Sequence, residues 1–107
     1  MKIWKDIDGY KNFYQVNNLG EIKSLPKKCG WRPTKEILLK QKITQFGYKG
    51  VALCKNYKRK YFFVHRLVTS AFIPNPENKK QVNHKDGNKK NNNIENLEWC
   101  TSSENHL

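Results

Sequence analysis

The stretch QVNHKDGNKKNNNIENLEWCTSSENH, from Gln81 to His106, decides the fold of this 107-residue chain. It opens with a short strand pattern, QVNH (81–84), crosses a polar loop rich in asparagine and lysine, and returns in a second strand pattern, LEWC (97–100). The run TSSE (101–104) has the spacing of a capping box, which predicts a helix start there and places Asn105 in the first helical turn. The sequence therefore predicts a ββα unit.

A helix is predicted just upstream of this unit. In HRLVTSAFI (65–73) the apolar residues recur at i, i+1, i+4 and i+5, which is the pattern of one face of a short helix. The PNP run at 74–76 predicts that this helix ends sharply.

The first two-thirds of the chain reads as short strands and turns. FYQV (13–16) and EIKSL (21–25) predict a hairpin around NNLG, in which Gly20 can take a positive φ. ILLKQKI (37–43) and GYKGVALCKNYKRKYFFV (47–64) predict two or three further strands, with KNYKRK (55–60) as a basic turn. The predicted fold class is α+β, with a basic, β-hairpin-rich part at 1–62 and the ββα unit within 63–107.

The charge of the chain is large and uneven. There are 21 Lys and Arg against 9 Asp and Glu, which gives a net charge of +12. Twelve basic residues and one acid, Glu36, fall between Ile22 and Lys60. Such a block indicates a polyanionic partner, with nucleic acid first and an anionic membrane surface second. The candidate phosphate contacts are Lys27, Lys28, Arg32, Lys58, Arg59, Lys60, Arg66, Lys85, Lys89 and Lys90.

Other patterns exclude several classes of protein. No apolar run is long enough for a transmembrane helix, and no signal peptide is expected. Cys29, Cys54 and Cys100 are far apart and never in a C-x-x-C pair, which argues against a structural zinc site and a disulfide framework. We expect three reduced, partly buried thiols in a cytoplasmic protein.

The residue types in the ββα unit suit phosphodiester hydrolysis, which needs a base for water and a cation for the developing charge. A neutral histidine suits the first role, and His84 ends the first strand. Oxygen donors suit the second, because Mg²⁺ prefers carboxylate and amide oxygens. Asn83 and Asp86 lie beside His84, and Asn96 is placed to bridge backbone groups across the loop.

Two stretches carry a family resemblance. Residues 64–106 resemble the HNH endonucleases of the phage and group I intron homing branch. The segment IWKDIDGYKNFYQVNNLGEIKSL (3–25) resembles a short motif that often precedes the nuclease unit in those proteins. The resemblance implies a DNA-binding region at 1–62 and an HNH, ββα-metal (His-Me finger) nuclease unit at 63–107.

The resemblance also implies roles for single residues. His84 matches the general base, Asn96 the central loop-fixing asparagine, and Asn105 the metal ligand on the helix. Asn83 stands where the family often has a metal-binding Asp, and it brings no charge. Asp86 and His65 are auxiliary candidates, and Asn88, Asn91, Asn92 and Asn93 are expected to contact DNA or form a solvated turn.

The expected activity is cleavage of double-stranded DNA, by nicking or by a double-strand break. The expected cofactor is Mg²⁺, with Mn²⁺ or another divalent cation as alternatives, in a phage or bacterial setting without an obligate protein partner. Two alternatives stay open: a catalytically inactive nucleic-acid-binding module of the same fold, and a basic ribosome-associated or structural protein.

Overall fold

The computed structural model describes residues 1–26, 28–29, 32–33 and 35–101. The predicted C-terminal helix and Asn105 lie outside the described residues, as does Lys27. The side chains of residues 28–29 and 32–33, which include the candidates Lys28 and Arg32, also lie outside the description.

The N-terminal region forms a four-stranded antiparallel sheet in the order β1-β2-β3-β6. Its strands are β1 (Trp4–Asp6), β2 (Tyr14–Asn17), β3 (Ile22–Ser24) and β6 (Ile37–Leu38). The predicted β2–β3 hairpin is confirmed, and Gly20 in its turn has φ +88°. No separate strand was predicted for β1, because three residues are too few to show an alternating pattern.

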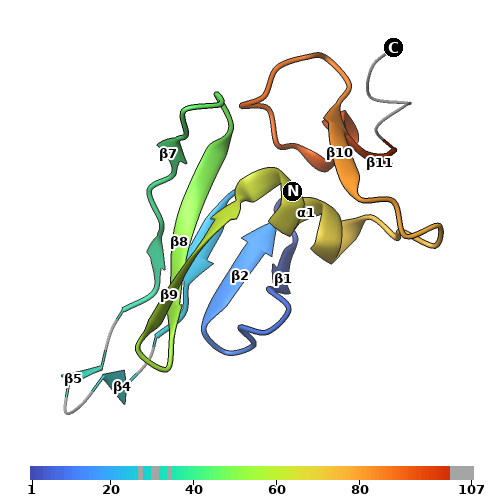
Figure 1. Cartoon of the computed structure of the whole chain (residues 1–107). Helices are drawn as coiled ribbons and strands as arrows, with labels where there is room; N and C mark the ends of the chain where they lie inside the picture. The colour runs from blue at the N-terminus through green and yellow to red at the C-terminus, as the bar shows by residue number, and fades with distance from the viewer. Residues whose placement is uncertain (27, 30–31, 34, 102–107) are drawn as a thin grey trace.

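A second antiparallel sheet contains β7 (Lys42–Ile43), β8 (Lys49–Lys55) and β9 (Lys58–Phe63). Asn56 and Tyr57 connect β8 to β9 with φ of 52° and 63°, which is the two-residue turn that suits the twist of a hairpin. The predicted basic turn at 55–60 was therefore too long, because its last three residues belong to β9. The short β4 (Lys28–Cys29) and β5 (Arg32–Pro33) pair at the far end of the molecule from β10 (Figure 1).

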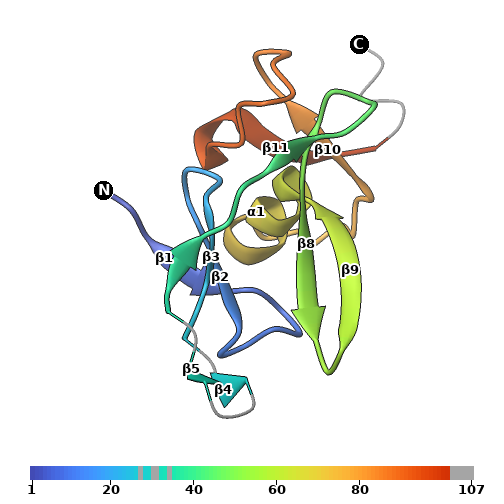
Figure 2. The ribbon, with the colours of Figure 1, turned by 90° about the vertical axis from the view of Figure 1, so that its left-hand side faces the viewer.

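The predicted helix is confirmed as α1 (Val64–Phe72), which follows β9 directly and ends before the PNP run. It lies between the sheets and the C-terminal hairpin (Figure 2). That hairpin consists of β10 (Gln81–His84) and β11 (Leu97–Cys100), antiparallel, with the 3-10 turn η1 (Ile94–Asn96) before β11. The two strands of the ββα unit are thus confirmed.

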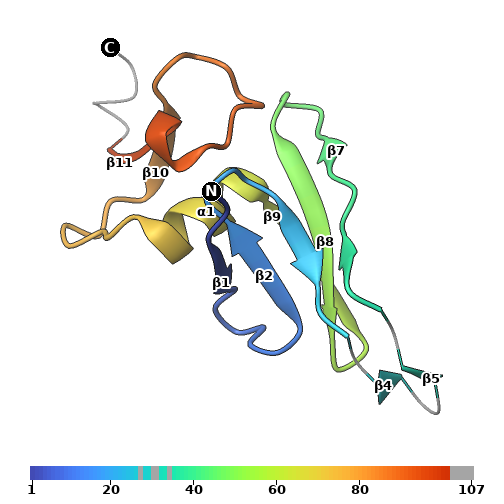
Figure 3. The ribbon, with the colours of Figure 1, turned by 180° about the vertical axis from the view of Figure 1, so that it is seen from behind.

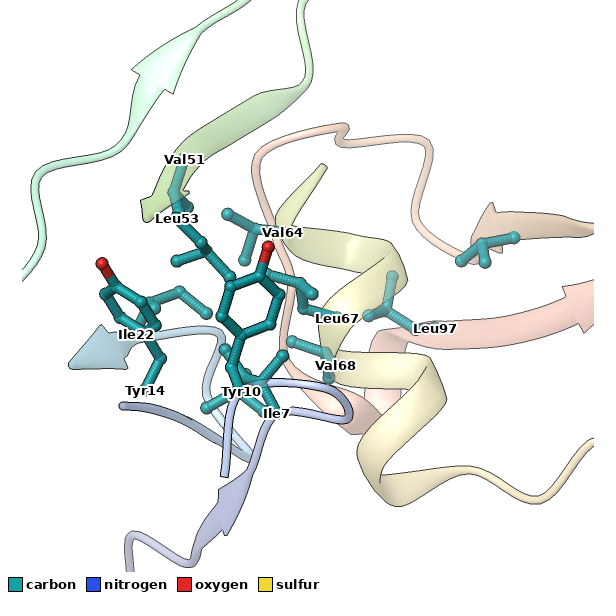
Figure 4. Packing of buried hydrophobic residues seen from close by; sticks show 12 residues of the cluster. Ile7, Tyr10, Tyr14, Ile22, Val51, Leu53, Val64, Leu67, Val68 and Leu97 are labelled. Carbon is teal, nitrogen blue, oxygen red and sulfur yellow. The ribbon is translucent and has the colours of Figure 1, made fainter. Parts of the chain in front are cut away.

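One hydrophobic core connects the two larger sheets, α1 and the C-terminal hairpin. It joins residues of β2, β3 and β8 to α1 and to the β10–β11 hairpin, as Figure 4 shows. The core is not divided at the predicted boundary between residues 62 and 63, because Val51 and Leu53 of β8 pack in the same cluster as Val64 and Leu97. The boundary itself stays a prediction.

The structure tests two further expectations from the sequence. Within the described residues, no helix is both long and apolar enough to cross a bilayer. Cys100 is buried, but Cys54 is exposed, so the expectation of a partly buried thiol is wrong for Cys54.

Candidate active site

His84, the last residue of β10, lies at the junction of the hairpin, α1 and β8. Its side chain is 7% exposed, and its ring centroid lies 5.2 Å from that of His65 and 5.8 Å from that of Tyr48. Its Nε2 lies 2.9 Å from Oδ1 of Asn92. Among the described residues, no group hydrogen-bonds to Nδ1 of His84. This nitrogen is also not fully buried, in contrast to Nδ1 of His65. The Nδ1 atom of His84 therefore reaches solvent.

His65 opens α1 directly beside His84. It stacks on Phe63 with a centroid distance of 5.3 Å and lies 4.9 Å from the ring of Tyr48. Burial lowers the pKa of His65 to about 4, with smaller contributions from His84 and Arg66. A neutral ring therefore adjoins His84 at neutral pH, and Nδ1 of His65 is buried without a partner among the described residues.

The polar loop after His84 is held by Asn96. Its Nδ2 donates to Oδ1 of Asp86 and to the carbonyl oxygen of Asn91, both at 2.9 Å, and its Oδ1 accepts from the Asp86 backbone at 3.0 Å. The Lys85 backbone also donates to the Asn96 carbonyl at 2.8 Å. One buried asparagine thus joins both ends of the loop.

Asp86 is exposed, but both of its carboxylate oxygens face the loop. Oδ2 accepts from Asn91 and Oδ1 accepts from Asn96 and from the Asn88 backbone. Hydrogen bonds from Asn91 and from the Asn88 backbone are the main reasons why the pKa of Asp86 is lowered. This carboxylate supports the loop, and its auxiliary role at the site stays a prediction.

Asn83 lies opposite Glu98 in the hairpin, and the two side chains are in contact. Nδ2 of Asn83 donates to Oε1 of Glu98 at 2.8 Å. Because a carboxylate only accepts, the amide nitrogen faces Glu98 and the amide oxygen Oδ1 faces away from it. Sequence reasoning missed Glu98, since its position opposite Asn83 depends on the strand register.

The donor set of this region fits a hard divalent cation. The amide oxygen of Asn83 is the type of ligand that Mg²⁺ accepts. Among the residues that the structure describes, no group of three His, Cys, Asp or Glu side chains is placed to hold a metal ion. The second predicted ligand, Asn105, lies outside the described residues.

The described basic candidates fall into two groups. Lys58, Arg59 and Lys60 are exposed along β9, and Lys85 and Lys90 are exposed in the loop after His84. Arg66 and Lys89 have partners within the protein, and so does Arg59, whose side chain hydrogen-bonds to Cys54 and Tyr61. Arg66 donates to the Lys80 carbonyl at 3.0 Å. Lys89 donates to the Phe46 carbonyl at 3.0 Å, so that the loop reaches the β7–β8 turn (Figure 3).

The structure corrects one expectation about the loop. Asn92 was grouped with DNA contacts or a solvated turn, yet it is 4% exposed and touches His84. Tyr48, whose ring lies against both histidines, was also missed. No sequence signal separates Asn92 from its neighbours, because four asparagines within six residues look alike until the loop closes.

Comparison with known proteins identifies relatives of both parts of the chain. The family model described as HNH endonuclease matches residues 62–107, and the NUMOD4 motif matches residues 3–54. The DNA endonuclease I-HmuI of Bacillus phage SP01 is 46% identical over 98 residues, which are 92% of this chain and 52% of that protein. The chain thus carries an HNH endonuclease unit at residues 62–107. The solved structure titled "DNA binding and cleavage by the HNH homing endonuclease I-HmuI" superposes with a TM-score of 0.81 at 42% identity, over 97% of this chain and 55% of that one.

A second relative comes from a virus of an amoeba. An uncharacterized HNH endonuclease, L245, of Acanthamoeba polyphaga mimivirus is 51% identical over 69 residues, which are 64% of this chain and 21% of that protein. The chain spans about half or less of the length of the curated relatives described here.

Proposed function

We propose that this chain carries the catalytic unit of a divalent-metal-dependent DNA endonuclease of the homing type, which hydrolyses phosphodiester bonds. The observation that supports this most is the setting of His84. It is a largely buried histidine whose Nδ1 has no hydrogen-bond partner among the described residues, and the residue before it in β10, Asn83, carries an amide oxygen that can bind a cation. A fixed base beside an oxygen donor is the pairing that hydrolysis of a phosphodiester needs.

In the proposed reaction, Nδ1 of His84 accepts a proton from the attacking water. Ring contacts with His65 and Tyr48 hold the His84 ring between them. Burial keeps the pKa of His65 low, so the His65 ring is neutral at neutral pH. The Asn96 hydrogen bonds keep the loop closed over the strand ends.

Mg²⁺ is the proposed cation, with Mn²⁺ or another divalent ion as an alternative. When bound, it stabilises negative charge on the phosphate and the leaving oxygen. Asn83 and Asn105 are the proposed ligands. Since neither carries a charge, affinity for the metal without DNA is expected to be weak.

The proposed substrate is double-stranded DNA, on the basis of the charge distribution and of the relative whose title names DNA binding and cleavage. The proposed contacts to phosphates are the exposed basic residues of β9 and of the loop after His84, namely Lys58, Arg59, Lys60, Lys85 and Lys90. For Lys27, Lys28, Arg32, Arg66 and Lys89 a DNA contact stays a prediction. The cytoplasm of a bacterium or phage-infected cell is the proposed location, because I-HmuI comes from a Bacillus phage.

Incubation of supercoiled plasmid with the chain tests this function. We expect nicked or linear product with Mg²⁺ or Mn²⁺, none with EDTA, and none with the His84→Ala variant while that variant still shifts the DNA in a gel. If wild type and His84→Ala cleave equally, or if neither cleaves, the alternative of an inactive nucleic-acid-binding module replaces the proposal.

A further inference from the structure

Asn92 lies between His84 and the β2–β3 turn of the N-terminal motif. We propose that Asn92 is a positioning residue for His84. Its amide oxygen keeps the ring proton on Nε2 and leaves Nδ1 to act as the base, and the turn at Gly20 holds Asn92 in place. This proposal rests on the proposed function, in which His84 is the base.

The tautomer follows from the chemistry of the contact. A neutral imidazole has one N–H donor and one acceptor nitrogen, and an amide oxygen can only accept. Oδ1 of Asn92 lies 2.9 Å from Nε2 of His84, so Nε2 carries the proton and Nδ1 keeps its lone pair. With the amide reversed, Nε2 would accept from the Asn92 amide and Nδ1 would carry the proton. Neither nitrogen could then take a proton from water.

The Asn92 side chain is held mainly by packing, because hydrogen bonds restrain it little. Its Oδ1 has His84 as a partner, whereas its Nδ2 is buried without a partner among the described residues. A Cβ atom added at Gly20 would lie 2.7 Å from Cβ of Asn92 and 3.1 Å from its carbonyl oxygen. Real Cβ atoms do not approach so closely, so only glycine allows the turn to lie against Asn92.

The turn that meets Asn92 is itself well fixed. Asn17 is fully buried, and its Oδ1 accepts from the backbones of Leu19 and Glu21 at 3.0 and 2.8 Å. The Asn18 carbonyl accepts from the Ile94 backbone at 3.0 Å, two residues beyond Asn92. The N-terminal motif therefore touches the loop on both sides of residue 93. In this proposal the N-terminal motif supports the loop after His84, in addition to any contact that it makes with DNA.

Nuclear magnetic resonance on the full chain tests the proposal. Long-range ¹H–¹⁵N spectra of ring-labelled histidine identify the tautomer of His84, and the His84→Ala variant assigns its signals. We expect the Nε2–H form in wild type and a mixture of tautomers in Asn92→Ala. In nicking assays at saturating DNA, the rate of Asn92→Ala should fall about tenfold, the effect of losing one hydrogen bond worth about 1.4 kcal/mol, with DNA affinity unchanged.

Gly20→Ala tests the support from the turn, and Gly9→Ala is its matched control. Both glycines have similar φ, +88° and +82°, so the backbone strain of an alanine is shared. A Cβ at Gly9 meets nothing within 4 Å, whereas at Gly20 it meets Asn92. We expect Gly20→Ala to resemble Asn92→Ala in tautomer and rate, and Gly9→Ala to resemble wild type.

The Nδ1–H form in wild type, or an unchanged tautomer and rate in Asn92→Ala, overturns the proposal. Equal effects of Gly20→Ala and Gly9→Ala overturn the part assigned to the turn. The spectra need no catalysis. If wild type fails to cleave DNA, the proposed function is wrong, but the spectra still decide whether Asn92 sets the tautomer of His84. Failure of the proposed function can therefore be told apart from failure of the Asn92 proposal.

Discussion

Replacement of Asn96 by alanine should open the loop after His84 and destabilise the whole chain. The variant loses three hydrogen bonds made by the side chain, two to Asp86 and one to the Asn91 carbonyl. At ~0.5–1.5 kcal/mol for each net hydrogen bond, the free energy of unfolding should fall by about 2–4 kcal/mol. For a domain near 100 residues, at about 4 °C per kcal/mol, Tm should fall by roughly 8–16 °C.

Thermal unfolding followed by circular dichroism measures this effect. Asn88→Ala is the matched control, because Asn88 is exposed in the same loop and its side chain accepts from the Lys90 backbone at 3.0 Å. Its cost should stay below about 1 kcal/mol. Equal changes in Tm for Asn96→Ala and Asn88→Ala would refute the view that Asn96 joins the ends of the loop.

Three further outcomes are expected. As pH falls from ~6.5, the ordinary histidine value, toward the pKa of about 4 of His65, the unfolded chain binds a proton that folded His65 does not, so stability should fall. His65→Phe should remove part of that fall, and an identical pH dependence of Tm would contradict this cause. The double variant Asn83→Asp with Glu98→Gln should need less Mg²⁺ for half-maximal nicking than wild type. Asn83→Asp alone should not, because it places two carboxylates at a 2.8 Å contact. The same Mg²⁺ requirement in the single and the double variant would argue against that contact. DNA affinity should drop by roughly 10³–10⁵ between about 50 and 200 mM salt if some 6–10 phosphates are contacted, and a flat response would remove the segment from Ile22 to Lys60 as the electrostatic footprint.

Local signals in the sequence predicted most elements of the fold. The β2–β3 hairpin, α1 and the β10–β11 hairpin each follow from turn residues or periodicity within a few residues. β1 was missed because its three residues depend on pairing with β2 rather than on a pattern of their own. The length of β9 was underestimated because lysines near Asn56 look like turn residues, although the turn closes in two residues.

The candidate site was less accessible from sequence, because it is built from contacts between distant residues. His84 and Asn83 stand out through their chemistry and through the family resemblance. The contact of Asn92 with both His84 and Gly20 joins positions more than sixty residues apart in sequence, and no local pattern encodes it. The ring of Tyr48 contacts that of His84 from the connection between β7 and β8, thirty-six residues earlier in the sequence, so no local pattern encodes this contact either.

The central claim is that His84 activates water in a metal-dependent cleavage of DNA. The most direct test is the single-turnover rate of plasmid cleavage with Mg²⁺, at chain concentrations that saturate the DNA, for wild type and His84→Ala. The account predicts that the rate falls by a factor of ~10²–10⁴, the usual contribution of a general base, while the concentration needed to saturate the DNA does not change. An undiminished rate in His84→Ala would contradict it.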